Sequence, residues 1–185
     1  MQATPFQLQD QFGQSVSLSD FSGKVVALTF LYTNCPDVCP LTTEALRKTY
    51  ETLGSDVSKV AFVAITVDPA RDTVQQVFQY SRDKEMLERW HFLTGSVEEL
   101  EPVWQGYFVA ADPYLSGEGG ATEFLTQATL AQRAKQAGLP AYLITHQAPV
   151  YLIDGNGQIR VLHSDVTLDT EPLVKDLRLL VKSQR

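Results

Sequence analysis

Two cysteines lie four residues apart in the sequence CPDVCP, at residues 35–40, and a proline follows each of them. They are the only two cysteines in the 185-residue sequence. A residue before proline is pushed out of the α-helical region, so Cys35 and Cys39 are not expected on successive turns of one helix. Pro40 suits the first helical position, where a missing backbone N–H costs nothing. We therefore expect Cys39 at a helix N-cap and Cys35 in the loop before it.

This placement would give the pair its chemistry. Both sulfurs would lie near the positive end of the helix, which favours thiolate over thiol. Thiolates are soft ligands that select Cu(I), zinc or iron–sulfur clusters. The carboxylate of Asp37, between the cysteines, opposes thiolate formation and favours a bound cation. The pair therefore indicates a metal site or a redox dithiol, and Asp37 leans the choice toward metal.

Two thiolates rarely complete a metal site, so a third ligand is sought among three histidines. His91 lies between two aromatic residues and is interpreted as structural. His163 ends a predicted hairpin strand and is interpreted as an exposed edge residue. His146 directly precedes a strand expected beside the central one, where a right-handed α/β arrangement brings the chain near Cys39. Spacing alone makes His146 a candidate ligand and leaves the choice open.

The elements that must position these residues begin with VVALTFL at residues 25–31, an unbroken apolar run typical of a strand buried on both faces. The cysteine loop follows it, at the carboxyl end where open α/β sheets usually place their chemistry. A second buried strand is expected at residues 60–67 and a short one at 91–93. Hairpins are predicted around Gly13 and around the DGNG turn that joins residues 149–153 to 158–162.

Helices are predicted between these strands, with residues 112–121 read as a Gly- and Ser-rich loop. Asp72 could cap the second helix, and Ser96 with Glu99 matches a capping box for the third. The order of elements predicts an α/β fold, with a central mixed sheet flanked by helices, after an N-terminal hairpin. We expect one domain over residues 1–185. The predicted helices span residues 41–53, 73–84, a segment from 97, 124–137, and a final segment carrying Leu173, Leu177, Leu180 and Val181.

Composition excludes several classes of protein. The sequence has 22 acidic and 15 basic residues and a formal net charge of −7, so no basic stripe is available to neutralise nucleic-acid phosphates. No apolar run approaches the roughly 20 residues needed to cross a bilayer. Two cysteines cannot build the disulfide framework of a small secreted protein.

Four segments together resemble the Sco/SenC family of copper-binding proteins: GKVVALTFLYTNCPDVCPLTTEAL, VAFVAITVDPARDT, WHFLTG and ITHQAPVYLIDGNG. Family members are thioredoxin-like domains that help to assemble the copper centre of cytochrome c oxidase. The resemblance runs from Phe6 to the final helix. It implies that Cys35 and Cys39 are thiolate ligands and His146 an imidazole ligand of a copper ion, as Cu(I) or Cu(II).

The resemblance also implies partners and a location. The expected partner is the copper-binding subunit of cytochrome c oxidase or another copper chaperone. The expected location is the periplasm, the outer face of the cytoplasmic membrane or an intermembrane space, with an N-terminal membrane anchor outside this sequence. In this family, Asp68 and Arg71 of DPARDT are interpreted as ordering a loop, while Tyr32 and Asn34 flank the site.

The sequence departs from the family pattern at three places. Many members have an aspartate just before the ligand histidine, where this chain has Thr145. The segment at residues 112–142 is longer than expected for the family. It is either an extra helix near the site, serving as a partner surface or lid, or a tolerated surface insertion. Pro149 stands where thioredoxins keep a cis proline, so the Ala148–Pro149 bond is either cis, which favours thiol–disulfide chemistry, or trans.

Two functions follow from these residues. The first, which the resemblance implies, is a copper metallochaperone. The second is a thiol–disulfide oxidoreductase that reduces cysteines of a partner protein with the Cys35–Cys39 pair, for which His146 would be dispensable. A peroxidase is disfavoured, because the cysteines are too close together in the sequence to resemble a distant resolving pair.

Overall fold

The apolar run at residues 25–31 forms β3 (Val25–Leu31), the middle strand of a five-stranded sheet in the order β10-β9-β3-β4-β5. The computed structural model describes residues 1–116, 122–138 and 141–183. β3 runs parallel to β4 (Val60–Thr66) and antiparallel to β9 (Val150–Ile153), so the sheet is mixed as predicted. The outer strands are β5 (His91–Leu93) and β10 (Ile159–His163).

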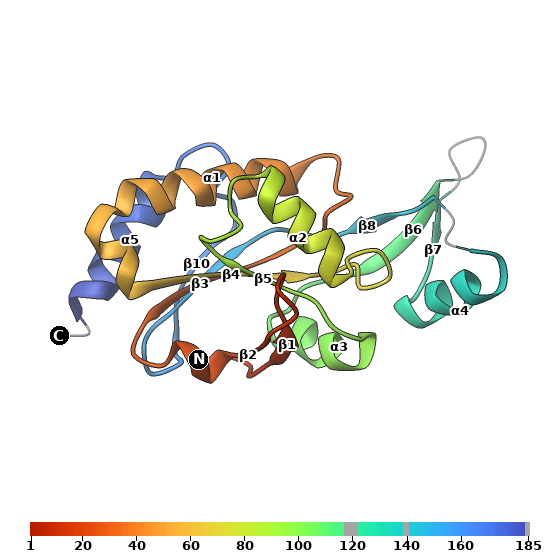
Figure 1. The fold of residues 1–185 in the computed structure, drawn as a ribbon, viewed down its shortest axis with the longest axis horizontal. Coiled ribbons are helices and arrows are strands. Elements are labelled where there is room, and N and C mark those ends of the chain that lie inside the picture. The colour runs from red at the N-terminus through yellow and green to blue at the C-terminus, as the bar shows by residue number, and fades with distance from the viewer. Residues whose placement is uncertain (117–121, 139–140, 184–185) are drawn as a thin grey trace.

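Helices cover both faces of this sheet (Figure 1). α1 (Val38–Leu53) and α2 (Val74–Asp83) lie on one face, and α3 (Val97–Gly106) lies on the other. α5 (Glu171–Ser183) packs beside α1. An N-terminal hairpin pairs β1 (Gln7–Gln9) with β2 (Ser15–Ser17), as predicted. Two 3₁₀ helices, Leu18–Phe21 and Gly54–Lys59, complete the connections.

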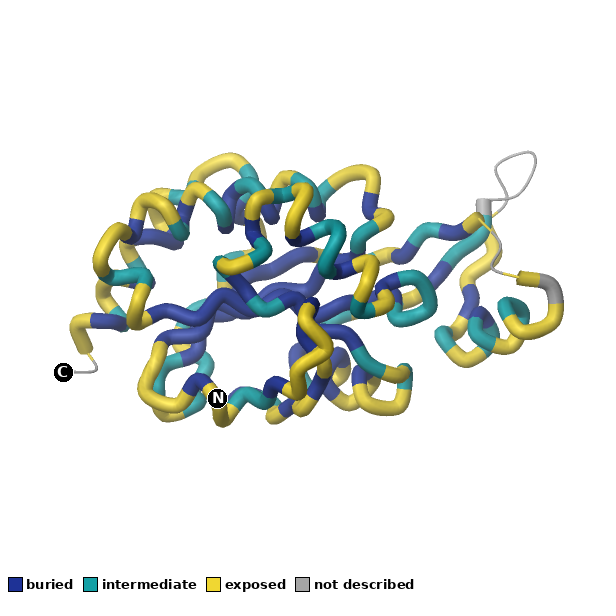
Figure 2. Tube along the Cα trace, viewed as in Figure 1, coloured by how far each residue is buried: buried dark blue, intermediate teal, exposed yellow. Residues whose placement is uncertain are grey.

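The core lies around β3 and β4, in which every residue is buried (Figure 2). Phe30 is fully buried and contacts the rings of Tyr107 and Tyr151. Burying a side chain of this size contributes roughly 1.5–3 kcal/mol to stability. The carboxyl ends of β3 and β4 are therefore held rigidly, and the loops that follow them start from fixed positions.

The described residues between 112 and 145 form an arm that projects from the five-stranded sheet (Figure 1), and they fold into a small sheet and one helix. Strand β6 (Asp112–Ser116) pairs with β7 (Thr122–Phe124) and β8 (Leu143–Thr145). Helix α4 (Gln127–Ala137) starts after β7 and ends at Gly138, whose φ is +80°. The prediction of a loop at residues 112–121 is therefore wrong at β6, and residues 117–121 lie outside the described residues.

Two predicted helix starts are also wrong. Helix α4 begins at Gln127 rather than at Phe124. Phe124 belongs to β7, where it pairs with Tyr114 of β6, and Thr126 provides the N-cap of the helix. Helix α2 is capped by Thr73, whose hydroxyl accepts the Gln76 N–H. The carboxylate of Asp72 is fully buried and turned toward neighbouring loops instead. The Ser96–Glu99 capping box of α3 is confirmed.

In the part of the chain that the structure describes, no helix has the length and apolar character needed to span a membrane.

Candidate metal centre

Three side chains from distant parts of the sequence meet at the carboxyl end of β3. Cys35 lies in the loop after β3, Cys39 in the first turn of α1, and His146 directly after β8. Their ligand atoms all lie within 4.8 Å of one another, and Cys39 Sγ is 3.1 Å from His146 Nε2. No second group of three or more such side chains is placed to hold an ion within the described ranges. These are the three residues that the resemblance singles out.

The first turn of α1 builds the cysteine pair. Helix α1 starts at Val38 with Asp37 as its N-cap, so the prediction of Cys39 at the N-cap is wrong by two positions. The reason is that the first four N–H groups of a helix have no partner within it, and a proline is therefore tolerated at the third position as well as the first. Cys35 lies outside the helix, as predicted. The backbone N–H of Cys39 is one of these groups without a partner in the helix, and it donates to Cys35 Sγ at 3.4 Å.

Cys35 is the more acidic of the two thiols. A hydrogen bond from the Cys39 side chain lowers the pKa of Cys35 to about 6, and hydrogen bonds with the backbone of Asp37 and Cys39 act in the same direction. Burial of the sulfur opposes this shift. Cys35 is therefore mostly thiolate at neutral pH, as the helix-end argument predicts.

Cys39 behaves in the opposite way, which corrects the prediction of two activated sulfurs. The residue is fully buried, and this burial raises the pKa of its thiol. The neighbouring Cys35 sulfur raises the pKa of Cys39 further. A helix terminus offers at most a modest gain to an anion, whereas removing a charge from water is more costly. Without a metal, the pair therefore holds one thiolate and one thiol.

His146 supplies a neutral imidazole. Burial lowers the pKa of His146 to about 4, so the ring is uncharged at neutral pH and Nε2 keeps a lone pair or a single proton. Nε2 is the ring atom close to the Cys39 sulfur. A neutral imidazole, a thiolate and a thiol that ionises on binding make a donor set suited to a soft or borderline metal ion.

Tyr32 forms a wall of the site. Its ring lies edge-on to the His146 ring, with 5.0 Å between ring centroids, and its hydroxyl accepts the Ile144 N–H at 3.4 Å. Tyr32 therefore touches both the imidazole and the strand that carries it. Asn34 is exposed, and its side chain accepts a hydrogen bond from Thr33. Of the two flanking residues predicted from the sequence, only Tyr32 contacts a candidate ligand.

The loop after β4 connects the two halves of the site, and the prediction that Asp68 and Arg71 order a loop is confirmed. Arg71 Nε donates to Asp68 Oδ2 at 2.5 Å, and Arg71 Nη1 donates to the Tyr142 carbonyl at 3.1 Å. The sequence analysis missed the role of Tyr142, which ties this loop to the start of β8. The available signal was an aromatic residue four positions before His146.

Asp72 is a second residue whose role was missed. Its carboxylate accepts hydrogen bonds from the backbone N–H and the hydroxyl of Thr33 and from the hydroxyl of Thr66. It thereby joins the cysteine loop to the end of β4. Burial and the nearby Asp68 carboxylate raise the pKa of Asp72 to about 7.

The other two histidines lie away from this centre. His91 Nδ1 is 3.4 Å from Asp10 Oδ2, and its ring packs on Phe21, which fits the structural interpretation. His163 is on the edge strand β10, with Nε2 3.1 Å from Asp176 Oδ2. Its side chain is only 14 % exposed, so the prediction of an exposed residue is wrong.

The Ala148–Pro149 bond is trans, since none of the described residues forms a cis peptide bond. Of the two isomers left open by the sequence, the structure has the one that a strand start permits.

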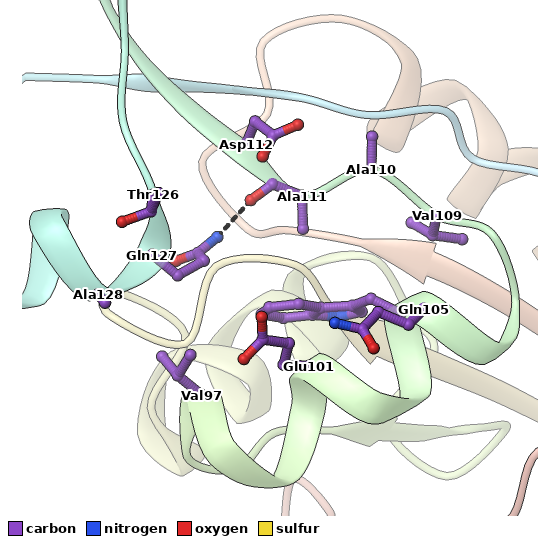
Figure 3. A pocket seen from close by; sticks show the side chains of 11 residues that line it. Val97, Glu101, Gln105, Val109, Ala110, Ala111, Asp112, Thr126, Gln127 and Ala128 are labelled. Carbon is purple, nitrogen blue, oxygen red and sulfur yellow. Dashed lines mark hydrogen bonds between the residues drawn. The ribbon is translucent and has the colours of Figure 1, made fainter.

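A separate cavity of about 360 Å³ lies between α3 and the start of α4 (Figure 3). Glu101 and Val97 of α3 lie on one wall, and Gln127 of α4 lies on another. None of the three candidate ligands lines this cavity. The metal centre is therefore assigned from its donor atoms and not from a hollow in the surface.

Comparison with known proteins supports this assignment. A family model described as SCO1/SenC matches residues 2–182. The chain is 30 % identical over 168 residues to "Protein SCO2 homolog, mitochondrial" of Danio rerio. This match covers 90 % of this chain and 52 % of that protein. It is 29 % identical over 154 residues to "Protein sco1" of Schizosaccharomyces pombe, covering 83 % of this chain and 51 % of that protein. The chain thus spans about half the length of these curated relatives.

Solved structures resemble the whole chain. Bradyrhizobium japonicum ScoI with copper bound has a TM-score of 0.76 and 27 % identity, covering 97 % of this chain and 99 % of that one. Yeast Sco1 with copper bound has a TM-score of 0.74 and 26 % identity, covering 98 % of this chain and 89 % of that one. These neighbours are thioredoxin-like, which confirms the predicted fold class.

Proposed function

The chain belongs to the SCO1/SenC family, and from this premise we propose that it is a copper metallochaperone. In this proposal Cys35, Cys39 and His146 bind one copper ion, which is then delivered to the copper centre of a cytochrome c oxidase. The observation that carries the proposal is the convergence of two sulfurs and one imidazole nitrogen within 4.8 Å. Copper-bound relatives of the same fold support it.

The ligand set suits a carrier that receives and releases its cargo. Two thiolates with Cu(I) carry a net charge of −1, and with Cu(II) they carry none, so both oxidation states are tolerated electrostatically. Soft sulfur favours Cu(I), and the imidazole is a good ligand for Cu(II). Cys35 is only 8 % exposed and Cys39 is fully buried, so a partner would approach the copper from the Cys35 side.

The partner and the location remain part of this proposal. We propose that the copper-binding subunit of the oxidase, or another copper chaperone, is the partner. The proposed location is the periplasm, the outer face of the cytoplasmic membrane or an intermembrane space, with a membrane tether outside the given sequence. We also propose that the chain is one domain in which residues 112–142 are an insertion beside the site.

His146→Ala is the experiment that tests the proposal. Removing one of three ligands should weaken copper binding about a hundredfold, because each ligand supplies a share of the binding free energy. Competition with a chromogenic Cu(I) chelator measures this. His91→Ala, which removes a histidine outside the centre, is the control and should bind copper like the wild type. Unchanged affinity in His146→Ala would remove the imidazole from the proposed site.

The second candidate function, thiol–disulfide exchange, is favoured by the unequal cysteines. The Cys35 thiolate can attack a partner disulfide, forming a mixed disulfide and releasing one partner thiolate. Cys39, on losing its proton, then attacks the Cys35 sulfur, which leaves a Cys35–Cys39 disulfide and a second partner thiol. Two electrons and the Cys39 proton pass to the partner, and the partner thiolate released first takes its proton from water. Insulin reduction by His146→Ala separates the functions, since retained reductase activity with lost copper binding favours this candidate.

Copper binding should release a number of protons that depends on pH. At pH 8, Cys35 is already a thiolate and His146 is neutral, so only Cys39 gives up a proton, about one per copper. At pH 5, which is below the Cys35 pKa of about 6 and above the His146 pKa of about 4, the release should approach about two.

Calorimetric titrations in buffers of different ionisation enthalpy measure this proton release. A release of about two protons at pH 8 would contradict the description of Cys35 as the low-pKa thiol. Because the affinity of the site falls as more protons must leave, copper binding should also weaken more steeply with decreasing pH below about 6.

A further inference from the structure

The arm is fixed to the rest of the molecule by the loop that follows β4. On one side, Gln127 Nε2 donates to the Val67 carbonyl at 3.1 Å and to the Ala111 carbonyl at 2.6 Å, the second of which is drawn in Figure 3. On the other side, Arg71 donates to the carbonyl of Tyr142. The position of β8, and of His146 after it, therefore depends on this loop.

Tyr142 is held there by three contacts. Its hydroxyl donates to Asp68 Oδ1, and its carbonyl accepts from Arg71. The Arg71 guanidinium carbon lies 3.7 Å from the centroid of the Tyr142 ring, within the range of a cation–π contact. Asp68 also accepts from Arg71 Nε, so the three side chains form a closed set, which we call the clamp. Asp68 is fully buried and Tyr142 is 4 % exposed.

The imidazole itself is held by the Ile144 backbone and by Tyr32. Strand β8 has three residues and pairs only with β6 of the arm. Thr145, directly before His146, is exposed, and among the described residues no carboxylate contacts the His146 ring. A metal-binding histidine usually donates its other ring N–H to a carboxylate, a backbone carbonyl or water, which fixes the orientation of its ring. Here the backbone of Ile144, within β8, is that partner, so the position of the ring follows from the backbone of β8 and from its contact with Tyr32.

We propose that Tyr142 is a positioning residue for His146, acting through the clamp with Asp68 and Arg71. The clamp sets β8, whose Ile144 backbone forms a hydrogen bond with the His146 ring, so that His146 Nε2 reaches the Cys39 sulfur. As a statement about copper, this inference rests on the proposed function. As a statement about the metal-free protein, it rests on the contacts alone.

Tyr142→Phe is the variant that isolates the hydroxyl. It keeps the ring for Arg71 and the backbone of β8, and it removes the single O–H that joins Tyr142 to Asp68. Tyr107→Phe is the matched control, because Tyr107 is also fully buried and its hydroxyl donates to the Thr4 carbonyl at 3.2 Å, with no contact to the site. Both variants lose one buried tyrosine hydroxyl.

Two readouts report on the imidazole. In the metal-free protein, the nearby Tyr32 ring shifts the proton resonances of the His146 ring, and Tyr142→Phe should reduce this shift while Tyr107→Phe leaves it unchanged. In the copper-loaded protein, Tyr142→Phe should weaken copper binding about tenfold. The Cu(II) complex should also show altered nitrogen hyperfine coupling. Arg71→Lys keeps the charge, loses the planar fork, and should act in the same direction.

The outcomes are distinct. Two readouts decide, the His146 resonances and the copper affinity. The inference is overturned if Tyr142→Phe and Arg71→Lys match the wild type in both readouts. It is also overturned if their changes are no larger than those of Tyr107→Phe. If the wild type binds no copper, the proposed function fails, and the metal-free resonances still decide the positioning role. If Tyr142→Phe fails to fold, Arg71→Lys with the same two readouts decides.

Discussion

Cys39→Ser is expected to lower the affinity for Cu(I) about a thousandfold, equivalent to roughly 4 kcal/mol. The substitution replaces a soft thiolate by a hard hydroxyl and leaves only Cys35 and His146 as strong ligands. The fold should survive, because the serine hydroxyl is smaller than the thiol and has His146 Nε2 within reach as an acceptor. Its cost in stability is therefore about 1 kcal/mol or less.

Thr42→Ser is a suitable control for this variant. Thr42 is buried in the same helix, three residues after Cys39, and does not belong to the group of candidate ligands. It should bind copper like the wild type. Chelator competition gives the affinities, and thermal unfolding of the metal-free proteins shows that both are folded. A folded Cys39→Ser protein with wild-type Cu(I) affinity would contradict the assignment of Cys39 as a ligand.

Asp72→Ala should have the largest effect on stability among residues outside the hydrophobic core. It removes the carboxylate that accepts hydrogen bonds from the Thr33 backbone N–H and from two hydroxyls. The Thr33 hydroxyl lies 2.5 Å from Asp72 Oδ1, and the Thr66 hydroxyl lies 2.6 Å from Asp72 Oδ2. Removing the acceptor of the buried Thr66 hydroxyl and of the partly buried Thr33 N–H should destabilise the protein by about 3 kcal/mol. For a chain of this size, that corresponds to a decrease in Tm of roughly 6–12 °C.

The same change should loosen the cysteine loop, because Thr33 is two residues before Cys35. Asp83→Ala, which removes an acidic residue from the exposed side of α2, is the control and should leave the Tm close to that of the wild type. Thermal unfolding of the metal-free proteins measures both. Equal Tm values for the two variants would show that the Asp72 network contributes nothing measurable.

The sequence predicts the central strands well because their signal is local. An unbroken apolar run is buried on both faces in this fold, and β3 has the bounds of the run at residues 25–31. The capping box at Ser96 and the hairpin turn before β10 are likewise short patterns with one structural outcome. The carboxyl end of β3 could thus be identified as the place of the cysteine loop.

The arm is where local patterns fail. Its strands β7 and β8 have only three residues each, which is too short for an alternating pattern to show. Pairing within the arm, and not the intrinsic preference of each segment, decides that residues 112–116 form a strand. The helical pattern that began at Phe124 was interrupted by this pairing, and only the Thr126 cap marks the true start of α4.

The candidate site was predicted in its residue types but not in its electrostatics. A helix end suggests two activated sulfurs, whereas complete burial of Cys39 raises its pKa and leaves Cys35 alone as the thiolate. Burial depends on how distant segments pack, as with His146, which lies against the Cys39 sulfur from 107 residues away, and no spacing rule predicts such packing. Tyr142 and Asp72 were missed for the same reason, since their partners are 74 and 39 residues away along the chain.

X-ray absorption spectroscopy of the copper-loaded protein tests the central claim most directly, because it counts the atoms bound to the metal. We predict two sulfur ligands and one imidazole nitrogen on Cu(I), with the nitrogen contribution lost in His146→Ala and kept in His91→Ala. A first shell of sulfur alone in the wild-type protein, or a nitrogen that persists when His146 is removed, would contradict the account.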